Sequence, residues 1–511
     1  MPVSGGRSRR ACRQAAGRGP IGQPVLGTGV EGVKVDQLFR LDPFRKRISR
    51  RSFMKLMGVA AAAAAAGPAL VRAQGQSGTL RILQWSHFVP SYDTWFDAYA
   101  KAWGAANGVN VIVDHVNLAD LPTAVAAEIS AGSGHDLIEI VGAEAGQFEP
   151  SLLDLTDINQ EAAGRFGDQL DIGKRYSFNP VTNKYYGFCI GWTIDPANYR
   201  RSLWEKAGMP DGPTTWEDLV TVGGKIRDEQ GVQLGIGLAQ ELDSNMAHRA
   251  ILYSFDSMLQ DAESNIVIDS GEPFERALEA VNFMKRLYEA AMTPEVFAWN
   301  AASNNQALLA GRASYILNSI SAYRSAQADV PDIAKDVFFG PALHGPRGSA
   351  WSNAHVIYNY IVPQHSGNVD AAKQFVLDLA ENYDQAMYAS KLYNSPSYFN
   401  APVTGAGEYP AVAGAKTFAD LHEAWFDDDP FRLEGEPAGK LKPLKNAVEW
   451  TTNVGRPGYT SPAVAEVFNT FVIPNMFARA VRGDETPEQA IKTGAAEARK
   501  VFEGWRQRGL I

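Results

Sequence analysis

The sequence predicts an α/β fold in two lobes, each built on a central, mostly parallel sheet flanked by helices. Strand-like and helix-like segments alternate from residue 79 onward, an order that places helices on both faces of a parallel sheet. Residues 74–511 number 438, which is enough for two hydrophobic cores. Bulky residues alternate over 184–194, a pattern that suits a strand passing between the lobes.

The first lobe opens with a predicted strand at 79–85, where polar and apolar residues alternate. A helix should follow with Ser91 as its N-cap and end before Gly108, because a glycine after the last periodic residue is a stop signal. The pattern then predicts a strand at 109–113, a helix at 123–131 and a strand at 136–141.

Later elements have clearer boundaries. Thr214 and Glu217 have capping-box spacing, which predicts a helix that runs from there to about residue 228. A strand is predicted at 355–362 and a helix at 370–380, and the last helix should begin after the cap Thr486. The segment 427–437 starts with three aspartates, and we expect a solvated turn there because calcium-loop spacing is missing.

The N-terminal region has the order of a secretory signal at residues 46–73: basic, then apolar, then a cleavage site. Arg50, Arg51 and Phe53 lie in a Ser-Arg-Arg-Ser-Phe-Met-Lys segment that resembles a twin-arginine signal, and Ala73 ends the cleavage site. We therefore expect the twin-arginine machinery to export the folded chain. Residues 1–45 are rich in Gly, Arg, Ser and Pro and are predicted to be a disordered leader.

Composition excludes several functions. Residues 74–511 carry 34 basic and 54 acidic side chains, a formal charge of −20, which argues against nucleic acid or an anionic membrane as partner. Cys189 is the one cysteine after the signal, so neither an internal disulfide nor an iron–sulfur cluster is expected. No zinc-protease or serine-hydrolase motif is present. We expect a soluble monomer that has no metal or cofactor, carries no lipid anchor and is not an enzyme.

Six short segments, in order, carry a family resemblance. Residues 204–208 end in Lys206-Ala207-Gly208, and 213–219 contain Thr215-Trp216. With these, the chain resembles the family 1 extracellular solute-binding proteins of ABC importers over nearly all of residues 74–511. The remaining segments are 80–85, 135–140, 186–203 and 305–318.

The resemblance implies a periplasmic-binding-protein-like fold in which the chain crosses between lobes and a solute binds in the cleft. It also implies an ABC permease as membrane partner and the periplasm as location. We expect lobe 1 at 79–192 plus 356–400 and lobe 2 at 193–355 plus 401–511.

Candidate ligand-binding residues follow from the chemistry of sugar recognition. Aromatic faces stack on sugar rings, and carboxylates and amides hydrogen-bond the hydroxyls, so such residues are sought at strand ends and crossovers. By contrast, Trp95, Trp103, Trp216 and Trp505 have helical spacing and are expected in the core. The candidates are Trp85, His87, Glu144, Trp192, Asp195, Asp243, Asn245, Trp299, Ser319, Trp351 and Asn353.

The predicted solute is a sugar or oligosaccharide, because four of the candidates are tryptophans. A polyamine would need more carboxylates around the aromatic rings, and a phosphorylated or other anionic solute would need a cation, for which Arg249 and Arg324 are the options. An exported glycoside hydrolase is the alternative enzyme, since it needs only two carboxylates.

Overall fold

The computed structural model describes residues 78–354 and 356–511. The predicted leader, 1–45, and the signal residues Arg50, Arg51, Phe53 and Ala73 lie outside the described residues. Within the described part of the chain, no helix has both the length and the apolar character needed to span a membrane. The fold class is confirmed as α/β, with two separate sheets and flanking helices.

The larger sheet has six strands in the order β13-β6-β12-β3-β1-β2. Leu80 and Ile82 of the first strand are fully buried, as the alternation predicts, and the strand is buried on both faces from Ile82 to its end at Trp85. The strands are β1 (Thr79–Trp85), β2 (Asn110–Val116), β3 (Leu137–Val141), β6 (Phe188–Trp192), β12 (Ile357–Ile361) and β13 (Ser395–Pro396).

This sheet is mixed, and the expectation of a mostly parallel sheet holds only for its first part. β1 pairs in parallel with β2 and β3, while β12 is antiparallel to both β3 and β6. The reason is topological: β12 is reached from the other sheet, so its direction is not set by a local strand–helix–strand unit.

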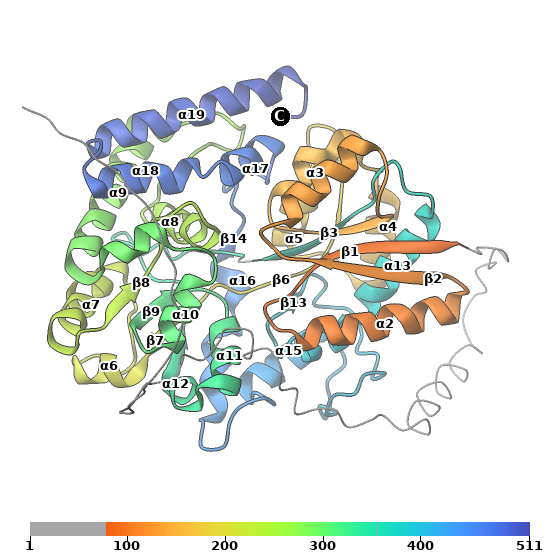
Figure 1. Cartoon of the computed structure of the whole chain (residues 1–511), viewed down its shortest axis with the longest axis horizontal. Helices are drawn as coiled ribbons and strands as arrows, with labels where there is room; N and C mark the ends of the chain where they lie inside the picture. Colours follow the sequence, from red (N-terminus) through yellow and green to blue (C-terminus); the bar gives the residue numbers. More distant parts are fainter. Residues whose placement is uncertain (1–77, 355) are drawn as a thin grey trace, which may run out of the picture. The chain divides into compact units, whose positions relative to one another are not determined.

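The first helices cover both faces of the larger sheet. The chain moves from β1 to β2 on one side of it and then returns past β1 to β3, and right-handed crossovers in opposite directions place their helices on opposite faces. Figure 1 shows α2 (Ser91–Asn107) and α3 (Leu121–Ala131) on opposite sides of β1. Ser91 is the first residue of α2, not its cap; its hydroxyl donates to the carbonyl of Ala389. The remaining helices of this part are η3 (Glu144–Ser151), α4 (Thr156–Phe166), α5 (Asp171–Ser177), α13 (Val369–Glu381) and α14 (Tyr383–Ala389).

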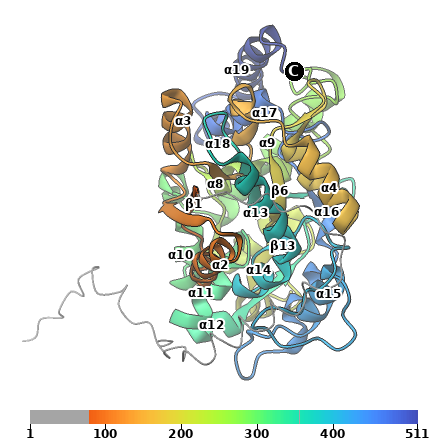
Figure 2. The same ribbon diagram turned by 90° about the vertical axis from the view of Figure 1, so that its right-hand side faces the viewer.

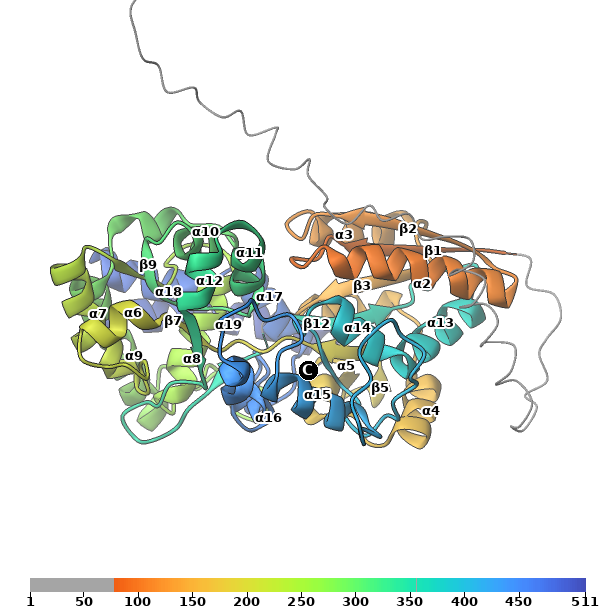
Figure 3. The ribbon, with the colours of Figure 1, turned by 90° about the horizontal axis from the view of Figure 1, so that it is seen from below.

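The smaller sheet has four strands in the order β10-β7-β9-β8, and it too is mixed. β8 and β9 are parallel, whereas β7 is antiparallel to β9 and to β10. Figure 3 shows α6 and α7 beside β7, and α2 and α3 beside β1, so each sheet has its own helices. The strands are β7 (Ala197–Arg200), β8 (Gln233–Gly235), β9 (Ala313–Leu317) and β10 (Val337–Gly340).

Helix α7 (Trp216–Gln230) begins with a capping box, but one residue later than the sequence predicted. Thr215 and Asp218, not Thr214 and Glu217, exchange side-chain and backbone hydrogen bonds. It packs against α9 (Gly271–Ala291). The other helices of this region are α6 (Arg201–Lys206), α8 (Leu242–Ser254), η4 (Pro294–Ala298), α10 (Ser303–Leu309), α11 (Ser321–Asp329) and α12 (Pro331–Asp336).

The C-terminal helices α17 (Pro462–Asn469), α18 (Val472–Arg482) and α19 (Pro487–Gln507) pack together, as Figures 1 and 2 show. The capping box predicted from Thr486 and Gln489 is confirmed at the start of α19. The remaining elements are α15 (Phe418–Asp427), η5 (Ala438–Leu444), α16 (Ala447–Trp450) and the two-residue strands β4 (Phe178–Asn179), β5 (Lys184–Tyr185), β11 (Ser352–Asn353) and β14 (Thr451–Thr452).

The segment 427–437 is mostly exposed, as its aspartates predict, but two of its carboxylates are buried. Asp429 is buried and accepts two hydrogen bonds from Arg324, at 2.7 and 3.1 Å, while Glu436 is buried against Lys440 at 2.7 Å. Arg324 lies on α11 and Lys440 lies on η5, just after the segment. Two carboxylates of this segment are therefore counterions of buried cations.

Candidate functional site

Trp85 and His87, predicted to reach a cleft from the end of β1, lie inside the hydrophobic core. Trp85 is fully buried and its ring centroid is 4.2 Å from that of His87. The imidazole lies between two carboxylates, with Nδ1 2.6 Å from Asp93 and Nε2 3.4 Å from Glu139. Burial lowers the pKa of His87, but these carboxylates raise it more, so the pKa is above its usual value.

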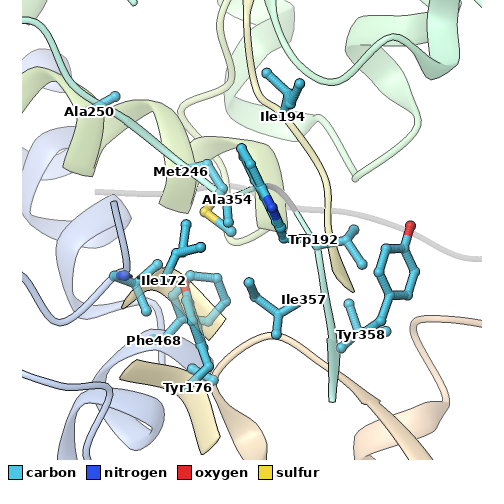
Figure 4. Packing of buried hydrophobic residues seen from close by; sticks show 14 of the residues in the cluster. Ile172, Tyr176, Trp192, Ile194, Met246, Ala250, Ala354, Ile357, Tyr358 and Phe468 are labelled. Carbon is cyan, nitrogen blue, oxygen red and sulfur yellow. Dashed lines mark hydrogen bonds between the residues drawn. The ribbon is translucent and has the colours of Figure 1, made fainter. Parts of the chain in front are cut away.

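Trp192, at the end of β6, is also a core residue. Its ring is fully buried, and its Nε1–H donates to the carbonyl of Pro396 at 3.2 Å. Figure 4 shows Trp192 among Met246 of α8, Ile194 and Ile357 of β12. The strand carries this ring into the packing between elements of the two sheets.

Three candidates lie close together at the ends of β8 and β9; they are Asp195, Asp243 and Ser319, and all are buried. Asn318 donates to Asp243 Oδ2 at 3.4 Å, and Ser319 Oγ donates to Asn318 Oδ1 at 3.2 Å. Burial, and then the charges of Glu241 and Asp195, raise the pKa of Asp243 well above its usual value. We call these residues, with Asn318 and Glu241, the acidic cluster.

The other group forms along α8, where it faces β11 and the segment 453–460. Asn245 Nδ2 donates to the carbonyl of Phe468 at 2.9 Å, and Asn353 Nδ2 donates to the carbonyl of Met246 at 3.1 Å. Trp351 is partly buried, and its backbone N–H donates to Ser254 Oγ at 3.1 Å. The guanidinium of Arg456 lies 3.5 Å above the Trp351 ring.

Arg249 completes this group, which we call the arginine cluster: Asn245, Arg249, Trp351, Asn353 and Arg456. Arg249 is 2% exposed, and its Nη1 donates to Oδ1 of Asn245, one helical turn earlier. Its guanidinium lies 5.0 Å from the Phe468 ring centroid. Burial lowers the pKa of Arg249.

Glu144 and Trp299 belong to neither cluster. Glu144 is the first residue of η3; it is partly exposed, and burial of its carboxyl raises its pKa to about 7. Trp299 follows η4 and packs partly buried against the core.

A hollow in the described surface lies away from both clusters. It has a volume of about 600 Å³ and lies among η3, β5 and the C-terminal end of α19. Phe148, Lys184, Tyr185, Trp505 and Arg508 line it, and none of the predicted ligand-binding residues does.

The sequence from residue 89 to 386 matches the model of the bacterial extracellular solute-binding proteins. The chain belongs to this family. The match covers more than half of the chain and includes all strands of the two sheets except β1 and β13.

Individual relatives of this solute-binding protein are distant. Two Brucella proteins whose names describe them as binding proteins, from Brucella abortus strain 2308 and Brucella suis biovar 1, are 25% identical over 288 residues. The alignment spans 54% of this chain and 66% of each relative, just under two thirds of their length.

Three solved structures show the same fold. The α-D-tagatose-bound solute-binding protein of Thermotoga lettingae and the maltose-bound MalE3 of T. maritima both superpose with a TM-score of 0.64, at 18% and 19% identity. Each alignment covers 83% of this chain and 100% of the other. The acarbose receptor GacH of Streptomyces glaucescens has a TM-score of 0.64 at 20% identity, covering 84% of this chain and 99% of that chain.

Two charged residues of this solute-binding protein have a larger structural part than the sequence predicted. Glu139 stands in the fully buried strand Leu-Ile-Glu-Ile-Val, and Arg249 stands in the buried run of α8. A charged residue inside an apolar run was the available signal, because such a residue requires a counterion or a ligand. Arg324, the other cation considered for an anionic solute, is fully engaged by Asp429.

Proposed function

We propose that this solute-binding protein is the exported binding component of an ABC importer and captures a sugar or oligosaccharide for delivery to a membrane permease. The observation that carries the proposal is the two polar clusters, which lie where the chain passes between its two sheets. β6 of the larger sheet leads directly to β7 of the smaller one, and Asp195 lies on that connection. The sugar complexes of three proteins with the same fold support a carbohydrate as solute.

The solute is proposed to enter when the two lobes part. We assign lobe 1 to 79–192 plus 356–400 and lobe 2 to 193–355 plus 401–511. Most residues of both clusters are buried, so a solute reaches them only from an open state. A solute that contacts both lobes binds the closed state more tightly and shifts the population toward it.

We also propose that the protein binds its solute without catalysing a reaction on it. The family consists of binding proteins, and the polar side chains of the clusters hydrogen-bond to one another as a recognition surface would. The alternative, an exported glycoside hydrolase, predicts release of reducing sugar from a glycoside incubated with the purified protein. Unchanged solute after prolonged incubation is the expected result.

Export is proposed to use the twin-arginine machinery, with cleavage after Ala73 and release into the periplasm. The test is the double substitution Arg50→Lys with Arg51→Lys, followed by cell fractionation. The protein should stay in the cytoplasm at its uncleaved mass. Unchanged periplasmic recovery of the variant would exclude this route.

A thermal-shift screen of the purified protein against neutral sugars, sugar acids, sugar phosphates and polyamines tests the proposed solute. A saturable rise in the melting temperature with a sugar is expected, because a ligand that binds only the folded state stabilises it. Polyamines are included because the acidic cluster gathers three carboxylates. Stabilisation by a polyamine and by no carbohydrate would contradict the proposal.

A further inference from the structure

Three cations of the described residues are buried to less than 4% exposure: Arg249, Arg324 and Lys440. Arg324 is paired with Asp429 at 2.7 Å and Lys440 with Glu436 at 2.7 Å, and both carboxylates are themselves buried. Among residues 78–354 and 356–511, no carboxylate pairs with Arg249, and its Nη2 has no hydrogen-bond partner. A buried charge without a counterion is costly, so a stable protein keeps one only when something else supplies the compensation.

The surroundings of Arg249 are made by elements that pack on both sheets. α8 begins beside the ends of β8 and β9, where Asn318 contacts Asp243. Tyr176 comes from α5, which packs on β6 and β12 of the larger sheet. Val454 joins the two sides: Tyr253 of α8 donates to its carbonyl at 2.9 Å, and its N–H donates to Tyr176 at 3.2 Å.

A second cation lies in the same group. Arg456 is half-buried over Trp351 and forms no ion pair with a described residue. The arginine cluster therefore has two positive charges and no internal carboxylate, in a chain whose residues 74–511 carry a net charge of −20. A local excess of positive charge within an acidic protein marks a place where an anionic group is stabilised.

We propose that Arg249 is the anion-recognition residue of the solute site and that the solute carries a carboxylate, as in a sugar acid. The inference rests on the proposed function and names the class of solute. When bound, the carboxylate accepts hydrogen bonds from Nη2 of Arg249, and Asn245 holds the guanidinium in place through Nη1. Trp351 is partly buried, and Arg456 covers one face of its ring at 3.5 Å, so the sugar ring is proposed to stack on the opposite face.

A carboxylate fits this arrangement better than a phosphate. One terminal nitrogen of Arg249 is already engaged by Asn245, which leaves Nη2 as the uncommitted terminal nitrogen. The buried charge of Arg249 is balanced by one carboxylate, whereas the second charge of a phosphate dianion would have to be offset by Arg456, which is only half-buried. The second cation, Arg456, lies on the Trp351 ring at the edge of the cluster.

The test compares matched ligands on the full chain. Galacturonate, glucuronate and digalacturonate are measured against their neutral methyl esters and against galactose, glucose and glucose 1-phosphate, first by thermal shift and then by calorimetry. A free carboxylate should bind about 100-fold more tightly than its ester, because the ester leaves the guanidinium uncompensated. This comparison needs no variant, so it holds even if a substitution disturbs folding.

Variants then assign the effect to one side chain. Arg249→Met should bind acid and ester with equal, weak affinity, and Arg249→Lys should keep part of the preference for the acid. The control is Arg286→Met, which removes an exposed arginine paired with Glu217 and should bind like the unmodified protein.

Three results would overturn the inference. Neutral sugars binding equally to the unmodified protein and to Arg249→Met would leave the proposed function intact and remove Arg249 from the site. Preference for the phosphate would exclude the carboxylate. No shift with any carbohydrate, acidic or neutral, would overturn the proposed function itself.

Discussion

Two buried arginines of this solute-binding protein, Arg324 and Arg249, are alike in burial and different in their partners. Arg324 is 3% exposed and has a bidentate contact with Asp429, a pairing that closes the segment 427–437 onto α11. Arg249 is 2% exposed; it donates a hydrogen bond to the amide oxygen of Asn245, and its guanidinium lies over the ring of Phe468. The first charge is compensated within the chain and stabilises the fold, whereas the second is left for a ligand to compensate.

The largest expected effect comes from breaking the compensated pair. Asp429→Asn leaves Arg324 buried without a counterion, and the free energy of unfolding should fall by about 3–5 kcal/mol. Urea denaturation measures it. The control Asp428→Asn removes a 65% exposed carboxylate paired with Arg432, and should change stability by less than about 1 kcal/mol. Equal losses for the two variants would mean that burial of the pair has no energetic weight.

Replacing each arginine with methionine tests whether Arg324 stabilises the fold more than Arg249 does. Arg324→Met leaves Asp429 as an uncompensated buried charge and should cost at least about 3 kcal/mol. Arg249→Met leaves only the Oδ1 of Asn245 without its donor, so its cost in the ligand-free protein should be about 1 kcal/mol. A loss as large for Arg249→Met as for Arg324→Met would show that Arg249 has an internal role equal to that of Arg324.

His87 is a third buried group with internal compensation, and it predicts a pH dependence. Its folded pKa is raised above 6.5 by Glu139 and Asp93, against the opposing effect of burial. The stability it contributes is therefore fully present below pH 6.5 and is lost as the pH rises through the raised pKa. Denaturation midpoints measured between pH 5.5 and 9 should fall with rising pH, and His87→Gln should flatten that fall. An unchanged slope in the variant would exclude His87 as its source.

His248 predicts a smaller effect of opposite sign, since it is buried beside Arg249. Burial, and next the charge of Arg249, lower its pKa to about 3, and its ring stacks on Phe477 at 4.6 Å. The neutral form is favoured in the folded state, so its contribution is present above pH 6.5 and lost as the pH falls below that value. His248→Phe should reduce the acid loss of stability between pH 6.5 and 4. His422, whose pKa is also lowered to about 3, accounts for a further part and is left in place as an internal reference.

Local sequence signals predicted the elements well. The capping box at Thr486 and the opening strand–helix order are confirmed, and the start of α7 was predicted to within one residue, because each depends on residues within a few positions of one another. The mixed character of both sheets was missed, since the direction of β12 depends on a connection that returns from the other sheet.

The burial of several candidate residues could not be predicted from the sequence, for a related reason. Trp85 and His87 follow a strand and have the composition of a binding loop, yet Glu139, 52 positions further on, compensates the imidazole and lets both rings enter the core. The same holds for Asp429, whose partner lies 105 positions away. Compensation between distant charges decides which polar residues become core and which remain for a ligand, and a single sequence does not display it.

The most direct measurement is a crystal structure of the protein with the sugar acid that stabilises it most. We expect the carboxylate within about 3.2 Å of Nη2 of Arg249. The sugar ring should lie against Trp351, and the solute should contact residues of both lobes. A sugar bound instead in the hollow lined by Trp505 and Arg508, with Nη2 of Arg249 still unoccupied, would contradict it.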